Sequence, residues 1–160
     1  MRPRFVPLAA LRLGLLLALA SLGWPAEVAA QRVTLTLQPT SITFASADPD
    51  TTPSVAAQSI LITYRVQQNQ GGTWRLMVLA SGDLITGPAS IDISNVSWTA
   101  TPTPPFQAGT LSKTVSQTVA SGSGNVNPAQ TGTLIFRLVN SWTYSAGLYT
   151  QSIIFTLSAP

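Results

Sequence analysis

Residues 58–78 decide the fold class and run Gln-Ser-Ile-Leu-Ile-Thr-Tyr-Arg-Val-Gln-Gln-Asn-Gln-Gly-Gly-Thr-Trp-Arg-Leu-Met-Val. Apolar side chains recur at every second position on both sides of the Asn-Gln-Gly-Gly segment: Ile60, Ile62, Tyr64, Val66, Trp74, Leu76 and Val78. A period of two indicates β-strands with one buried face. The glycine-containing segment at 69–72 is a turn signal, so the two strands are predicted to pair as a β-hairpin.

The same alternation extends over most of the chain. Further strands are predicted at 33–37, 42–44, 91–100, 114–119, 133–140 and 149–157. Segment 114–119 is polar and is expected at a sheet edge, whereas 133–140 is apolar on both faces and is expected at a sheet centre. Eight or nine short strands at regular spacing predict one all-β domain, an antiparallel Ig-like β-sandwich with Greek-key links.

The segments between these strands have loop composition. Proline, glycine, serine and aspartate concentrate at 46–54, 101–110 and 121–128. Proline has no N–H to donate to a sheet, and glycine and aspartate favour turns. All three segments are therefore predicted to be loops, and no segment after residue 30 has a convincing helical pattern.

The N-terminus has the layout of a secretory signal peptide. Three arginines (Arg2, Arg4 and Arg12) precede or flank an apolar run at 13–22, and Val28-Ala29-Ala30 forms a small-residue cleavage site. The run is shorter than the roughly 20 residues that a membrane-spanning helix needs. We expect cleavage after Ala30, a single domain at 31–160 with no membrane span, and location in the cell envelope or outside the cell.

The composition removes most catalytic and nucleic-acid-binding chemistry. The chain has no cysteine and no histidine, and residues 31–160 also lack glutamate. Histidine is the commonest general base and metal ligand. Residues 31–160 hold five basic and four acidic side chains, so no basic cluster is present for phosphate contacts. We expect a protein that is not an enzyme, needs no cofactor and binds no nucleic acid.

Two groups of aspartates have spacings that suggest sites. Asp48, Asp50 and Thr52 have the alternate spacing of a calcium loop, but the glutamate and glycine of such loops are missing. Aspartate also forms turns with its own nearby backbone, and this is the favoured interpretation. Asp83 and Asp92 as a glycosidase pair would need to lie close together, which nothing in the sequence indicates.

Two motifs resemble a known family. Residues 70–78 contain a Gly-rich turn followed by Trp74-x-Leu76, and residues 146–157 contain a closing strand with Tyr149, Phe155 and Leu157. Together they resemble the bacterial WxL-type surface domain, although Phe155 stands where a tryptophan is usual. The closing strand is also similar to the last strand of fimbrial and spore-coat-type subunits. The resemblance implies a non-catalytic β-sandwich of the cell envelope, with peptidoglycan as one partner; alternatively, these five residues are ordinary core residues.

Two aromatic residues lie in a polar loop at 140–145. Trp142 and Tyr144 stand between the last two predicted strands and are the best candidates for exposed aromatic rings. A flat ring stacks on a sugar, but the same ring also buries well in a core. Glycan contact and loop packing therefore remain as alternatives for these residues.

The first strand after the predicted cleavage site suggests a mode of assembly. Val33, Leu35 and Leu37 share one face of segment 31–38. Such a segment either pairs within its own domain or completes the sheet of a neighbouring subunit by strand addition. We expect a secreted, non-catalytic structural subunit that associates with itself or with other surface proteins. The alternative is a module that binds cell wall or glycan through its loop aromatics.

Overall fold

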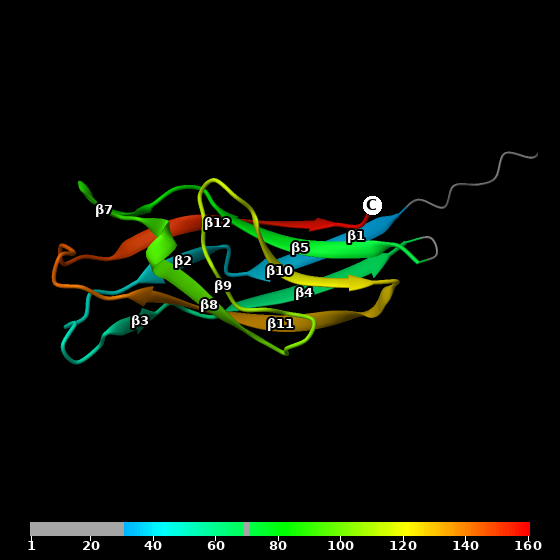
Figure 1. Cartoon of the computed structure of the whole chain (residues 1–160), viewed down its shortest axis with the longest axis horizontal. Coiled ribbons are helices and arrows are strands. Elements are labelled where there is room, and N and C mark those ends of the chain that lie inside the picture. Colours follow the sequence, from blue (N-terminus) through cyan, green and yellow to red (C-terminus); the bar gives the residue numbers. More distant parts are fainter. Residues whose placement is uncertain (1–30, 69–70) are drawn as a thin grey trace, which may run out of the picture.

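The computed structural model describes residues 31–68 and 71–160, so the predicted signal peptide at 1–30 lies outside it. The predicted fold class is confirmed: two antiparallel sheets pack face to face as a β-sandwich. The described residues form twelve strands and one short 3₁₀ helix, Ile93–Asn95. Figure 1 shows an elongated domain whose long strands run along its long axis. None of the described residues belongs to a helix long and apolar enough to span a membrane.

The first sheet has the strand order β1-β4-β11-β8-β9, and β3 pairs with a further part of β11. Its members are β1 (Arg32–Gln38), β3 (Ser54–Ala56), β4 (Ile60–Gln67), β8 (Val96–Thr101), β9 (Gly109–Thr110) and β11 (Val126–Val139). The predicted central strand is confirmed, because β11 pairs with both β4 and β8.

The second sheet has the order β10-β5-β12-β6-β7, and β2 also pairs with β12. Its members are β2 (Ser41–Phe44), β5 (Thr73–Ala80), β6 (Leu84–Thr86), β7 (Ala89–Ile91), β10 (Gln117–Ser123) and β12 (Tyr149–Ser158). The polar strand predicted at an edge corresponds to β10, which begins three residues later than predicted, at Gln117.

The predicted hairpin at 58–78 is wrong. β4 lies in the first sheet and β5 in the second, so the chain crosses between the sheets instead of turning back within one. The rings of Tyr64 and Trp74 meet across the interior with centroids 5.0 Å apart. Two strands with one apolar face each can either pair edge to edge or face each other across a core. Alternation and a glycine turn are compatible with both arrangements.

The predicted number of strands, eight or nine, is also too low. The additional strands are β3, β6, β7 and β9, which have only two or three residues each and lie in or beside segments where no strand was predicted. Between β1 and β2 the chain changes sheets at Pro39, which cannot continue a ladder because it lacks an N–H. Strands of two or three residues are too short to show a hydrophobic period, so the sequence pattern does not reveal them.

The predicted loop at 121–128 is largely wrong as well. Only Gly124 and Asn125 lie between β10 and β11. Gly124 has a φ of 73°, a conformation that suits glycine in a tight turn. Pro128 lies in β11 where its register with β4 shifts between Val126 and Gln130, and such an irregularity tolerates a residue without an N–H.

Aromatic rings join the two sheets. Tyr64 contacts Trp74 and also meets Phe106 edge to face, with centroids 5.7 Å apart and planes at 85°. Phe106 is buried although it comes from the predicted loop at 101–110. A Cβ atom on Gly132 of β11 would overlap the ring of Phe106, so this ring lies directly on the strand's backbone. Each such ring pair is worth about 0.5–1.5 kcal/mol beyond the area it buries.

We predict that Gly132→Ala lowers the free energy of unfolding by about 1–3 kcal/mol, because the added methyl group must displace Phe106 from a packed core. Urea denaturation followed by tryptophan fluorescence measures the change. Thr131→Ala on the exposed face of the same strand is the matched control and should change stability by less than about 0.5 kcal/mol. Equal effects of the two substitutions would contradict the packing of Phe106 on Gly132.

Candidate functional site

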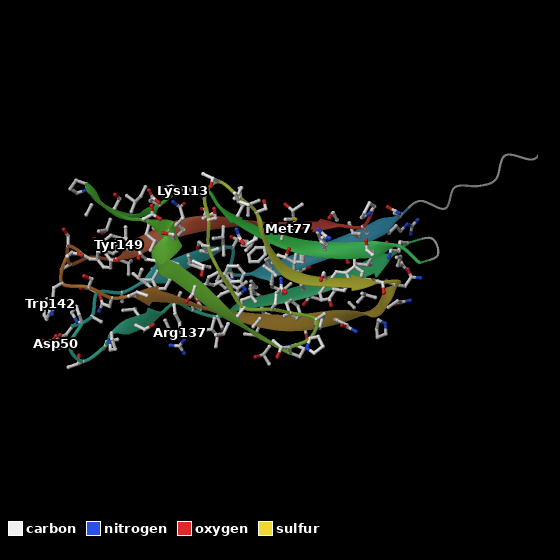
Figure 2. All side chains as sticks on the ribbon, in the orientation of Figure 1. Asp50, Met77, Lys113, Arg137, Trp142 and Tyr149 are labelled. Atoms are coloured by element: carbon white, nitrogen blue, oxygen red, sulfur yellow. The ribbon has the colours of Figure 1, made fainter. Side chains whose placement is uncertain are left out.

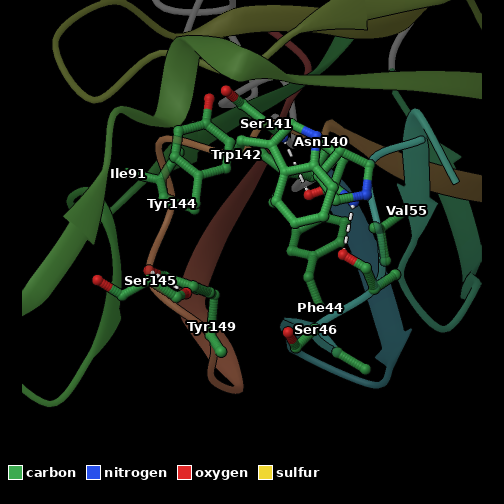
Figure 3. Close-up of a pocket in the computed structure, with 15 residues that line it drawn as sticks. Phe44, Ser46, Val55, Ile91, Asn140, Ser141, Trp142, Tyr144, Ser145 and Tyr149 are labelled. Atoms are coloured by element: carbon green, nitrogen blue, oxygen red, sulfur yellow. Dashed lines mark hydrogen bonds between the residues drawn. The ribbon is translucent and has the colours of Figure 1, made fainter.

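Two loops meet at one end of the sandwich and enclose a cavity of about 110 Å³. One loop follows β2 and contains residues 45–53, and the other links β11 to β12 and contains residues 140–148. Figure 3 shows the side chains of both loops around this cavity. Its apolar walls include Phe44, Val55, Ile91, Leu138 and Tyr149, and its polar walls include Ser46, Asn140, Ser141, Tyr144 and Ser145.

Asn140 holds the two loops together. Its Nδ2 atom donates hydrogen bonds to the carbonyl oxygens of Ala47 at 3.0 Å and Thr52 at 2.9 Å. Its backbone N–H donates to Pro53 at 2.9 Å, while its Oδ1 atom accepts the N–H of Ser141 at 3.0 Å. The Asn140 side chain is therefore fully engaged in structure, and the cavity walls are braced before any ligand arrives.

The aspartates of the first loop have structural partners. Asp48 Oδ1 accepts the N–H of Asp50 at 2.9 Å, and the Asp48 carbonyl accepts the N–H of Thr52 at 2.8 Å. This is the side-chain turn expected of an aspartate in a loop. Asp50 Oδ1 accepts the indole N–H of Trp142 from the other loop at 3.1 Å. Nothing in the sequence connects Asp50 to Trp142, and sequence reasoning missed this pair.

The structure places the two loop aromatics differently. Trp142 is 68% exposed and lies beside Asp50 at the tip of the domain, as Figure 2 shows. Tyr144 is half-buried and packs against the core. Below them the hydroxyl of the buried Tyr149 donates to the carbonyl of Ser145 at 3.0 Å. The exposed aromatic surface at this end is therefore the indole of Trp142, with Tyr144 forming part of the cavity wall.

The residues of the two family-like motifs lie side by side in the second sheet. β5 pairs with β12, and Leu76 stands opposite Leu157 in this ladder. Trp74, Leu76 and Tyr149 are buried, and Phe155 and Leu157 are half-buried against the core. These positions fit a packing role, and the five residues do not line the cavity as a group.

The predicted donor strand pairs within its own domain. β1 forms a continuous ladder with β4, from Arg32 opposite Gln67 to Gln38 opposite Leu61. Its inward-facing residues are not fully covered: Val33 is 42% exposed, and Leu35 and Leu37 are half-buried. β1 is also the edge strand of the first sheet.

Asp83 and Asp92 meet around a lysine. Lys113 Nζ lies 2.8 Å from both carboxylate oxygens of Asp83 and 3.4 Å from Asp92 Oδ2. Hydrogen bonds from Ser94, followed by the charge of Lys113, lower the pKa of Asp92. A glycosidase general acid needs a raised pKa, and the lowered pKa of Asp92 does not suit that role. Their cluster is an exposed ion pair that joins segments distant in sequence.

Comparison with known proteins finds no matching protein family, no matching curated protein and no matching solved structure. The resemblance to WxL-type and fimbrial-type domains therefore stays a prediction, based on the two motifs alone.

We predict that Asn140→Ala lowers the free energy of unfolding by about 1–3 kcal/mol, because it leaves two partly buried carbonyl groups without donors. Thermal and urea denaturation measure this loss. Asn95→Ala is the control, since the Asn95 side chain makes one exposed hydrogen bond to the carbonyl of Asp92 and should contribute less. If the two variants were equally stable, the bracing role of Asn140 would be wrong.

The ion pair of Lys113 predicts a pH dependence. Because the pKa of Asp92 is lowered in the fold, its stabilising effect is present above the ordinary aspartate pKa of about 3.9 and is lost as pH falls through the lowered value. Lys113→Met removes a smaller cause of this lowering and leaves the larger one, the Ser94 hydrogen bonds, so it should be slightly less stable than the wild type at pH 7, with a smaller difference at pH 2. Urea denaturation at both pH values tests this. Arg75→Met, which removes an exposed cation outside any ion pair of the described residues, should show no such pattern.

Proposed function

We propose that this chain is an exported, non-catalytic structural subunit of a cell surface or extracellular matrix that associates through an open sheet edge. The observation that supports this most directly is the edge formed by β1. Its backbone is paired on one side only, and its apolar face is incompletely covered. Such an edge is a template for pairing with another chain.

The other edge strands are shorter than β1 or partly covered. β9 at the far end of the first sheet has two residues, and β7 in the second has three. β10 is partly covered, because Phe106 forms a bridge to Ala120 and the N–H of Gln107 donates to Val119 at 2.8 Å. Short or covered edges are the usual protection against association. β1 has seven residues and a single charged side chain, Arg32, so it lacks this protection.

The last strand leaves a second open segment beside β1. Residues 149–152 of β12 pair with β2, whereas residues 153–158 pair with β5 and with no other strand of the described residues. This segment has no charged residue, and its Phe155 and Leu157 are half-buried. Two incompletely covered apolar stripes, one from each sheet, therefore belong to the first and last strands of the domain.

Exchange of β1 between copies would use contacts that already exist. The strand is joined to the rest of the domain at Pro39 and Thr40, where the chain changes sheets. If β1 of one copy takes the place of β1 on β4 of the next, the ladder and the contacts of Leu35 and Leu37 are all regained. Exchange of identical elements is a low-cost route to assembly. The signal-like N-terminus and the sparse charge of residues 31–160 support an exported subunit that packs closely with its copies.

We predict that a Thr36→Cys/Thr63→Cys variant, oxidised at high protein concentration, forms covalent dimers and longer species. These two residues stand opposite each other in β1 and β4, and the chain has no other cysteine. A disulfide that joins position 36 of one copy to position 63 of another indicates that β1 of one copy lies on β4 of the next. A non-reducing gel separates the products, and peptide mapping identifies the joined positions. The control is Thr101→Cys/Thr133→Cys, an opposite pair in β8 and β11 that should close within one chain.

Two measurements could contradict exchange of β1 between copies. Covalent monomers alone at every concentration, together with a wild type that remains monomeric by light scattering, would rule out exchange of β1. Removal of residues 31–38 gives an independent measurement, because exchange predicts that the shortened chain no longer forms assemblies.

A further inference from the structure

The geometry points to a carbohydrate site at the loop end of the domain, where Trp142 stacks on a neutral, N-acetylated sugar unit and the adjacent cavity receives its acetamido group. This inference is independent of assembly through β1, because it concerns different features of the domain: a fixed aromatic ring, a small apolar cavity and an acidic rim.

The ring of Trp142 is both exposed and held in place. Of the tryptophans in the described residues, Trp74 and Trp98 are buried, whereas Trp142 is 68% exposed. Its indole N–H donates to Asp50 across the gap between the two loops at 3.1 Å. A ring fixed by its edge keeps its face available for the C–H groups of a sugar and loses little conformational freedom on binding.

The cavity beside Trp142 has the size of a single substituent of a sugar ring. Its volume of about 110 Å³ is far below the roughly 300–1,000 Å³ of sites that enclose a whole drug-sized ligand. Phe44, Val55 and Leu138 form apolar walls, and Tyr144 and Ser145 bring polar groups to the same space. An acetamido group matches this lining, because its methyl group suits the apolar walls and its amide can hydrogen-bond to hydroxyl or backbone groups.

The charges around the site select against acidic glycans. Loop segments 45–53 and 140–148 contain two charged side chains, Asp48 and Asp50, and no lysine or arginine. Asp50 uses Oδ1 for Trp142, and its Oδ2 accepts no hydrogen bond from the described residues, so this oxygen is open to a sugar hydroxyl. A uronate, sulfate or phosphate group would meet like charge at this rim. The site therefore fits a neutral chain with N-acetyl groups.

The test compares two oligosaccharides that differ at one group. Chitohexaose has an acetamido group where cellohexaose has a hydroxyl, and isothermal titration calorimetry measures the affinity of the full domain, residues 31–160, for each. We expect chitohexaose to bind at least about tenfold more tightly, the effect of filling a small apolar cavity. A hyaluronan oligosaccharide, which keeps alternate acetamido groups but adds carboxylates, should not bind.

Substitutions in the loop at 140–148 test where the sugar binds. Trp142→Ala should weaken chitohexaose binding by more than about tenfold, as loss of a central aromatic contact does. Trp142→Phe keeps a ring for stacking and should retain part of the affinity. Leu148→Ala is the matched control, since Leu148 is an apolar residue of the same loop that is 60% exposed and does not line the cavity. Circular dichroism and thermal denaturation confirm that each variant is folded.

Several results would overturn the inference. Equal affinity for chitohexaose and cellohexaose would show that the cavity does not recognise the acetamido group. Binding that survives Trp142→Ala, or is lost equally in Leu148→Ala, would place the sugar elsewhere. Absence of binding to either neutral oligosaccharide at millimolar concentration would remove the site altogether, and it would leave assembly through β1 unaffected.

Discussion

The contact of Tyr64 with rings from both sides of the sandwich is the interaction on which the rest of the structure depends. Tyr64 is a β4 residue of the first sheet, Trp74 belongs to β5 of the second, and Phe106 comes from the segment between β8 and β9. Burial raises the pKa of the Tyr64 hydroxyl, which donates to Oε1 of the exposed Gln130 at 3.2 Å and so keeps a hydrogen-bond partner at the border of the core. A domain without cysteine has no disulfide to join its sheets, and here aromatic packing takes that role.

Because this core lies between the two sheets, the edge strand β1 and the loop end of the sandwich are left for contacts with other molecules. The edge at β1 has an apolar face that the domain covers incompletely, which is the condition for pairing with a second chain. The end near Trp142 is different, because Asn140 and Asp50 tie two loops together around a preformed cavity. Assembly and sugar recognition would thus use separate surfaces of one rigid scaffold, and neither requires a catalytic group.

The success and failure of the sequence-based predictions follow from what each depends on. The alternation in 60–66 and 74–78 predicted buried and exposed faces correctly, since a residue's side of a strand depends only on its position parity. The hairpin was wrong because the choice between pairing and facing depends on distant strands, here β11 and β12. The exposure of Trp142 was foreseeable from its polar neighbours. Its hydrogen bond to Asp50 was not, since the two residues are 92 positions apart.

The amino-acid sequence alone determined that this is an all-β protein with an apolar face on most strands, a polar loop around Trp142 and no thiol or imidazole chemistry. These properties are local: they depend on residue type and on the period of the strand. Only the tertiary structure decided which strands share a sheet, which edge stays open and which loops enclose the cavity. The physical reason is that backbone pairing and side-chain packing between remote segments minimise the free energy of the whole chain, and no short segment contains the information to choose its partner.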